Sequence, residues 1–230
     1  MTEIDTPAQP PAAQPPAAPG QGLNPHPIRL VVADDLHRSR LTVLVRLIIA
    51  YPALIYLALW SIPASFVLLA QWFYTLFAQR PHPRMHAFLS RFVRQYTVVT
   101  AYVYLLANPY PNQRGLPGDY PIDLEIDPSE HQAWWKTLLR SILAIPAYIL
   151  SYIFSYLAQI VAVIMWIVGV IMGRVPKGLR DFAAYLLRYQ TQTWAYVFLL
   201  TDRYPALSTP DPKGPVQVVP PKETLVVNYV

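Results

Sequence analysis

The feature that most constrains this chain is a pair of long uncharged tracts, residues 47–79 and 141–173, which contain no Asp, Glu, Lys or Arg. Each tract has 33 residues, whereas a helix that crosses a membrane needs about 20 apolar residues. Charged residues make up only 13% of the whole chain, compared with about 25% in a soluble domain. This composition argues against a soluble globular enzyme and against a disordered protein. We therefore predict an integral membrane protein.

The two tracts belong to an internal repeat. Residues 27–111 align with 121–205 at a constant offset of 94, with about 26 identities in 85 positions. Because the repeat is direct, each copy should cross the membrane an even number of times. The fold class that we predict is an all-α membrane protein with about four transmembrane helices in two tandem two-helix repeats, and with short β-strands on one membrane face.

The repeat also divides the chain into segments. Short alternating runs at 27–34 and 121–127 open the two copies and predict strands that pair with each other or with a C-terminal run at 224–230. The Pro/Ala-rich start has neither the basic end nor the apolar core of a signal peptide. The predicted organisation is a disordered tail (1–26), membrane repeat 1 (27–111), a linker (112–120), membrane repeat 2 (121–205) and a Pro-rich tail with a short terminal strand (206–230).

A 33-residue tract would reach about 50 Å as one helix, which is more than the bilayer core. It is therefore either a hairpin of two short helices or a single crossing that starts in the membrane interface. We favour the single crossing, with a kink at Pro52 and Pro146. Trp72 and Trp166 would then lie in an interfacial aromatic belt. Second spanning helices are expected at 87–107 and 181–200.

Four arginines recur in apolar surroundings near the starts of helices: Arg46, Arg94, Arg140 and Arg188. A guanidinium group at the bilayer centre is costly, so these side chains should reach the interface. They could bind lipid phosphate, because arginine binds phosphate with two parallel hydrogen bonds. They could instead serve as simple interface anchors, which is the interpretation that we favour.

Two further patterns have both a functional and a structural interpretation. Arg188, Thr191, Gln192 and Ala195 share one helix face, which indicates either a polar groove or, as we favour, hydrogen bonds between helices. His82 and His86 have the spacing of metal ligands on a helix. Pro83 lies between them and no third ligand is near, so we predict no metal site and no cofactor.

Copy two carries motifs that resemble a known family. The segment GRVPKGLRDF at 173–182 and the ending LLTDRYP at 199–205 are similar to the bacterial membrane family catalogued as domain of unknown function 4389, and both copies resemble it. Copy one departs at Gln79 and at NPYP (108–111), which makes copy two the better candidate for a site. The resemblance implies a membrane location but no reaction. The residues that carry it are Gly173, Arg174, Pro176, Gly178, Asp181, Phe182, Asp202, Arg203, Tyr204 and Pro205.

The distribution of acidic residues limits the classes of function that the chain can have. No Asp or Glu occurs from 36 to 118, and Asp181 is the one acid between 131 and 201, which argues against carboxylate-coupled transport. We predict a non-enzymatic scaffold or accessory subunit in contact with anionic lipid; the alternative is a lipid or small-molecule transporter built from two repeats. Expected partners are membrane lipids and a membrane protein, with no nucleic acid. The expected location is the bacterial plasma membrane, as a multi-pass protein with cytoplasmic termini.

Overall fold

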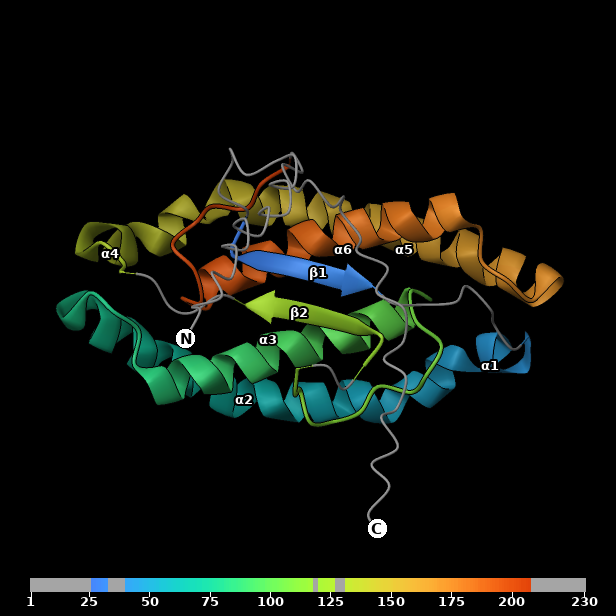
Figure 1. The fold of residues 1–230 in the computed structure, drawn as a ribbon, viewed down its shortest axis with the longest axis horizontal. Helices are drawn as coiled ribbons and strands as arrows, with labels where there is room; N and C mark the ends of the chain where they lie inside the picture. The colour runs from blue at the N-terminus through green and yellow to red at the C-terminus, as the bar shows by residue number, and fades with distance from the viewer. Residues whose placement is uncertain (1–25, 33–39, 118–119, 127–130, 208–230) are drawn as a thin grey trace, which may run out of the picture.

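The structure is a computed structural model that describes residues 26–32, 40–117, 120–126 and 131–207. The segments expected as tails therefore lie almost wholly outside the described residues, and so does the expected terminal strand. Within the described part, each repeat has one strand followed by three helices (Figure 1). The elements are β1 (Ile28–Val32), α1 (Arg40–Leu44), α2 (Arg46–Ala78), α3 (Pro83–Val103), β2 (Ile122–Ile126), α4 (Trp134–Leu143), α5 (Ile145–Met172) and α6 (Lys177–Val197).

Most of each uncharged tract forms one long helix, so the hairpin alternative is wrong. Helix α2 has 33 residues and continues through Pro52, while α5 has 28 residues and carries Pro146 in its first turn, where proline costs no hydrogen bond. The chain breaks just before each long helix, at Val45 in copy one and at Ala144 in copy two. The short helices α1 and α4 precede these breaks, which lie before Pro52 and Pro146, the positions at which the sequence predicted a kink.

The second helix of each repeat differs from its prediction. Helices α3 and α6 begin about four residues earlier than expected, because Pro83 can occupy the first turn of α3 and Pro176 can cap α6. Both helices bury polar side chains, including Gln95 and Gln190. Among the described helices, α2 and α5 are long and apolar enough to cross a membrane; α3 and α6 do not meet that criterion, so four transmembrane helices are not confirmed.

The two repeats pack in a crossed arrangement. Helices α3 and α6 lie side by side beneath the two-stranded sheet, with α2 against α3 and α5 against α6 (Figure 1). The short opening helices exchange partners, because α1 packs on α5 and α4 packs on α2. Each repeat therefore supplies a short helix that packs against the long helix of the other repeat.

A pseudo-two-fold axis relates the copies. Of the two pairings predicted for the opening strands, the pairing with each other is confirmed: β1 and β2 are antiparallel, and Leu30 lies opposite Leu124, its counterpart 94 residues later. Beneath the sheet, the hydroxyl oxygens of Thr97 and Thr191, again 94 residues apart, lie 3.3 Å from each other. Residues that meet their own counterparts must lie on the symmetry axis, so the axis passes through the sheet and between α3 and α6.

The long helices contact the rest of the fold mainly through small or polar residues. The buried side chains of α2 include Ala50, Ala53 and Ala64, whereas its large apolar side chains, such as Phe66, are exposed. Small residues allow α2 to approach α3 closely, as in helix pairs within membranes. Much of the apolar surface of α2 consequently remains outside the protein core.

The end of α5 offers a test of the backbone geometry. Gly173 terminates α5 at φ 69°, in the left-handed region, where a Cβ is unfavourable by about 1 kcal/mol. We expect Gly173→Ala to lower the free energy of unfolding by about that amount, measured as the thermal midpoint in detergent micelles. Gly178→Ala is the matched control, because nothing lies within 4 Å of a Cβ at that position. Equal midpoints for the two variants would contradict this account.

Candidate functional site: two buried arginine centres

The first arginine centre surrounds Arg46 at the start of α2. Its side chain is 1% exposed, and its guanidinium group donates hydrogen bonds to the carbonyl oxygens of Tyr102, at 2.7 Å, and Ala107. The guanidinium carbon also lies 4.0 Å from the centre of the Tyr102 ring. Arg46 therefore fastens the start of α2 to the C-terminal end of α3.

The second centre repeats this geometry and adds an ion pair. Arg140 donates to the carbonyl oxygens of Tyr196 at 2.5 Å and Thr201 at 3.1 Å, and its guanidinium carbon lies 4.5 Å from the Tyr196 ring centre. The Asp202 carboxylate accepts from Arg140 at 3.1 Å and from Lys136 at 2.8 Å. Burial lowers the pKa of Arg140, and Tyr196 and Asp202 oppose that shift.

Arg46 and Arg140 each bind carbonyl oxygens at an unusual helix end. Leu105 and Leu199 follow the ends of α3 and α6 with φ of 58° and 59°, a conformation that leucine rarely adopts. The backbone N–H groups of the next residues donate to Ala101 and Ala195 at 2.9 Å, which is the hydrogen bonding of a Schellman turn. By binding carbonyl oxygens on both sides of this turn, each arginine stabilises it.

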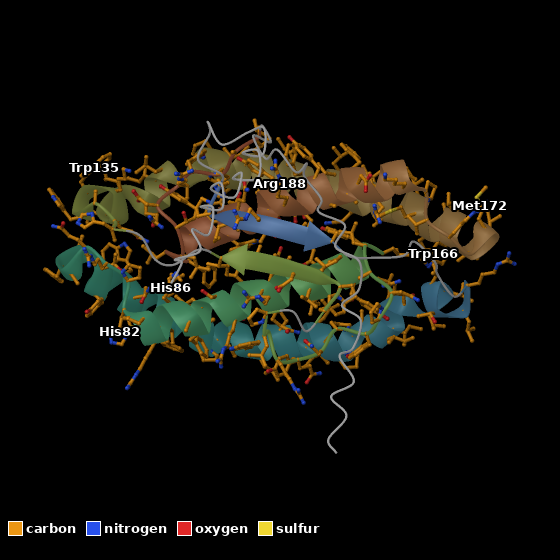
Figure 2. The ribbon with its side chains drawn as sticks, viewed as in Figure 1. His82, His86, Trp135, Trp166, Met172 and Arg188 are labelled. Carbon is orange, nitrogen blue, oxygen red and sulfur yellow. The ribbon has the colours of Figure 1, made fainter. Side chains whose placement is uncertain are left out.

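Arg94 and Arg188 lie elsewhere. Arg94 donates to the Asp123 carboxylate and to the carbonyl oxygen of Leu124, both at 2.9 Å, and so ties α3 to β2. Arg188 lies in the middle part of the molecule (Figure 2) and is 3.4 Å from the carbonyl oxygens of Ala206 and Leu207. These two arginines therefore hold strand and loop segments, whereas Arg46 and Arg140 hold helix ends.

The four arginines predicted to bind lipid phosphate thus form two pairs with different structural roles. All four are at most 8% exposed, and each donates hydrogen bonds to groups of the protein itself. The sequence showed no acid beside them because Asp123 and Asp202 come from strand and loop segments that are distant along the chain. Lipid binding by these arginines stays a prediction, since phosphate would have to replace bonds that they already make.

The two repeated tryptophans connect the copies. Trp72 donates its indole N–H to the carbonyl oxygen of Thr137 at 2.9 Å, and Trp166 donates to that of Val43 at 2.8 Å. Each bond runs from a long helix to the opening helix of the other repeat. These bonds give the two tryptophans a role in joining the repeats, and their position in an interfacial belt stays a prediction.

The polar stripe of α6 is buried in the protein. Besides the contact between Thr97 and Thr191, Gln192 donates to the carbonyl oxygen of Ile28 at 3.1 Å and accepts from the backbone N–H of Ala206 at 3.2 Å. Ala195 is also fully buried. The favoured interpretation, hydrogen bonding between packed elements, matches these contacts.

The histidines are positioned separately, close to one end of the molecule (Figure 2). His82 packs edge-on against Tyr74, and the Nε2 atom of His86 is 3.4 Å from the carbonyl oxygen of Leu200. Burial lowers the pKa of His86. In the part of the chain that the structure describes, no three residues of the kinds His, Cys, Asp and Glu form a metal-binding group.

The motif residues of copy two have structural positions. Gly173 ends α5 and Pro176 caps α6, while Asp181 accepts a hydrogen bond from Arg180 at 2.8 Å. Arg174, Gly178 and Phe182 are exposed. The ending Asp202–Pro205 joins the second arginine centre: the Arg203 backbone donates to the Thr201 hydroxyl at 3.1 Å, and the Tyr204 ring lies 5.6 Å from that of Tyr196. Pro205 is buried.

Three pockets with mainly apolar linings lie along the long helices, and we refer to them together as the trough. The first pocket, of about 390 Å³, is bordered by Ala58 of α2 and by Tyr96 and Trp194 of α3 and α6. The other two, about 440 and 580 Å³, are related by the repeat. One contains Arg140 with Trp72, and the other contains Arg46 with Trp166. Both arginine centres therefore border the trough.

The fold and its two centres define a duplicated helical module with two long apolar helices. The family model for a domain of unknown function, DUF4389, matches the chain twice, at residues 40–113 and 135–208. Because these matches cover more than half of the chain, the protein belongs to this family, and the tandem copies predicted from the sequence are confirmed. No curated protein and no solved structure gave a match.

The second arginine centre can be tested through its counter-ion. Asp202→Asn would leave the buried Arg140 charge without a carboxylate, and we expect the free energy of unfolding to fall by about 2 kcal/mol. Lys136→Gln is the matched control, because this cation pairs with the same Asp202 carboxylate but its side chain is 39% exposed; its effect should be about 0.5 kcal/mol or less. Thermal unfolding in detergent measures both, and a control that shifts as much as Asp202→Asn would refute the assignment.

Proposed function

We propose that the protein is a membrane-bound, non-enzymatic scaffold or accessory subunit that contacts anionic lipid. The observation that carries this proposal is the exposed apolar surface of α2 and α5. Along α2, side chains such as Ile48, Leu59, Phe66 and Phe77 are 62–82% exposed. Contiguous apolar surface of this kind is typical of a membrane or protein contact site.

The polar residues support a structural role. The repeated arginines, tryptophans and threonines hold helix ends, strands and repeats in position, as the contacts of Arg46, Trp72 and Thr97 illustrate. A rigid module with one apolar face and a sheet on the other side is suited to presenting a surface to a partner. The bacterial plasma membrane is the location that we propose, and the multi-pass arrangement stays a prediction that the geometry of the long helices does not favour.

The absence of cysteine from the chain permits a direct test with single-cysteine variants. A photoreactive maleimide would be attached to Arg29→Cys in β1 or, as the matched probe, to Phe66→Cys on α2, and irradiated in native membranes. We expect lipid adducts from Phe66→Cys and a protein adduct of one fixed mass from Arg29→Cys. Adducts with no fixed protein partner at Arg29→Cys would contradict the scaffold role.

A second candidate function is favoured by the trough, whose pockets have the size of small-molecule sites. In this alternative the protein handles lipid or another apolar molecule, with the two repeats as its halves.

This alternative predicts that lipid stays bound during purification. Ala58→Phe, which fills the first pocket, should then reduce the lipid retained in native mass spectrometry several-fold. Ala70→Phe is the control, because Ala70 is exposed on the same helix and does not border the three pockets that define the trough. If both variants retain as much lipid as the parent chain, the lipid-handling role is excluded.

A further inference from the structure

The two long helices run in opposite directions. The indole of Trp166, near the end of α5, is bonded to Val43, just before the start of α2, and a Cβ on Gly169 would lie 3.4 Å from Val43. At the other end, the backbone N–H of Gln132, just before α4, donates to the carbonyl oxygen of Gln79 at 2.9 Å. The α2–α3 and α5–α6 connections therefore lie at opposite ends of the molecule (Figure 1).

This arrangement conflicts with a direct repeat whose copies cross a bilayer in the same sense. If α2 and α5 crossed, the two connections would be on opposite sides of the membrane. Strand β2 would have to carry the chain back across, because it runs from the α1 end toward the α4 end (Figure 1). The sheet, with the charged residues Arg29 and Asp123, would then lie at the depth of the hydrocarbon core, where exposed strand edges and charges are strongly disfavoured.

We propose that the protein lies within one leaflet, with its pseudo-two-fold axis along the bilayer normal, α2 and α5 parallel to the surface and the sheet toward water. This inference rests on the membrane location given under the proposed function. In this orientation the α2–α3 and α5–α6 connections lie on the same side of the membrane. Figure 1, viewed down the shortest axis of the molecule, shows the helices and strands extended across the plane of view, as this orientation requires.

The length and exposure of α2 agree with this orientation. Its 33 residues extend about 50 Å, well beyond a hydrocarbon core of about 30 Å. Yet Ile48 near its start and Phe77 near its end are 76% and 82% exposed, and Leu59 between them is 62% exposed. At about 100° per residue these three side chains lie within roughly 20° of one helix face. A helix parallel to the surface places all three in the same layer of lipid.

The ends of the molecule favour a lipid surface over a second copy of the chain. Exposed basic residues lie at both ends: Arg40 and Lys177 at one, Arg80 and Arg84 at the other. Exposed apolar residues accompany them, with Trp135 at one end and Met172 at the opposite end (Figure 2). Basic side chains at the rim of an apolar face suit anionic headgroups. In a face-to-face pair of copies, the basic ends would face each other.

The orientation can be measured by spin labelling. Ile48→Cys, Leu59→Cys and Phe77→Cys would each carry a nitroxide in vesicles of phosphatidylcholine and phosphatidylglycerol, with Arg29→Cys as the water-side control. Oxygen and nickel-complex relaxation give the depth of each label. We expect equal depths for the three positions of α2 and a shallower Arg29→Cys. In a second measurement, Arg80→Cys and Arg174→Cys should react with an impermeant maleimide from the same side of sealed native vesicles.

The outcomes separate this inference from the membrane location itself. If alkaline carbonate leaves the protein in the membrane but Leu59→Cys is clearly deeper than both end positions, the helix crosses and the inference is overturned. Labelling of Arg80→Cys and Arg174→Cys from opposite sides would overturn it too. Low accessibility to both relaxants along α2, together with a dimer mass, would show that a second copy covers the face. Release of the protein by carbonate would instead remove the proposed membrane location.

Discussion

The fold depends on a guanidinium group placed against the end of a neighbouring helix. In each repeat, a buried arginine at the start or just before the start of the long helix binds carbonyl oxygens around the left-handed turn that ends the amphipathic helix. Unpaired carbonyl groups at a buried helix end would be costly, and so would an unpaired buried charge. The interaction satisfies both groups at once.

The two copies of this interaction have diverged. Copy two surrounds Arg140 with Asp202 and Lys136, whereas copy one has Asn108 and Thr42 at the corresponding positions. The Arg46 guanidinium accordingly depends on carbonyl oxygens and on the face of Tyr102. The family motif ending in Asp-Arg-Tyr-Pro is thus retained where the carboxylate has a charged partner. The two copies therefore share their backbone geometry but differ in the charged groups that surround the arginine.

The sequence predicted those features that follow from local composition and from the repeat. The absence of turn residues favoured one continuous helix in each tract, and the alternation around Leu30 and Leu124 predicted strands that pair. The partners of Arg140 and Trp72 could not be predicted, because they come from residues about 60 positions away that are joined only in three dimensions. Composition also indicated how apolar α2 is, but not its direction relative to α5, which depends on the exchange of α1 and α4.

That exchange of opening helices has a consequence for biosynthesis. The indole N–H of Trp72 in the first repeat has its acceptor at Thr137 in the second. The first repeat therefore leaves the ribosome before α4, which packs on α2, has been synthesised. Until then the nascent chain exposes the surface of α2 that α4 will later cover. The two halves consequently form one cooperative unit, and a break in the linker between them would separate each long helix from the segment that closes it.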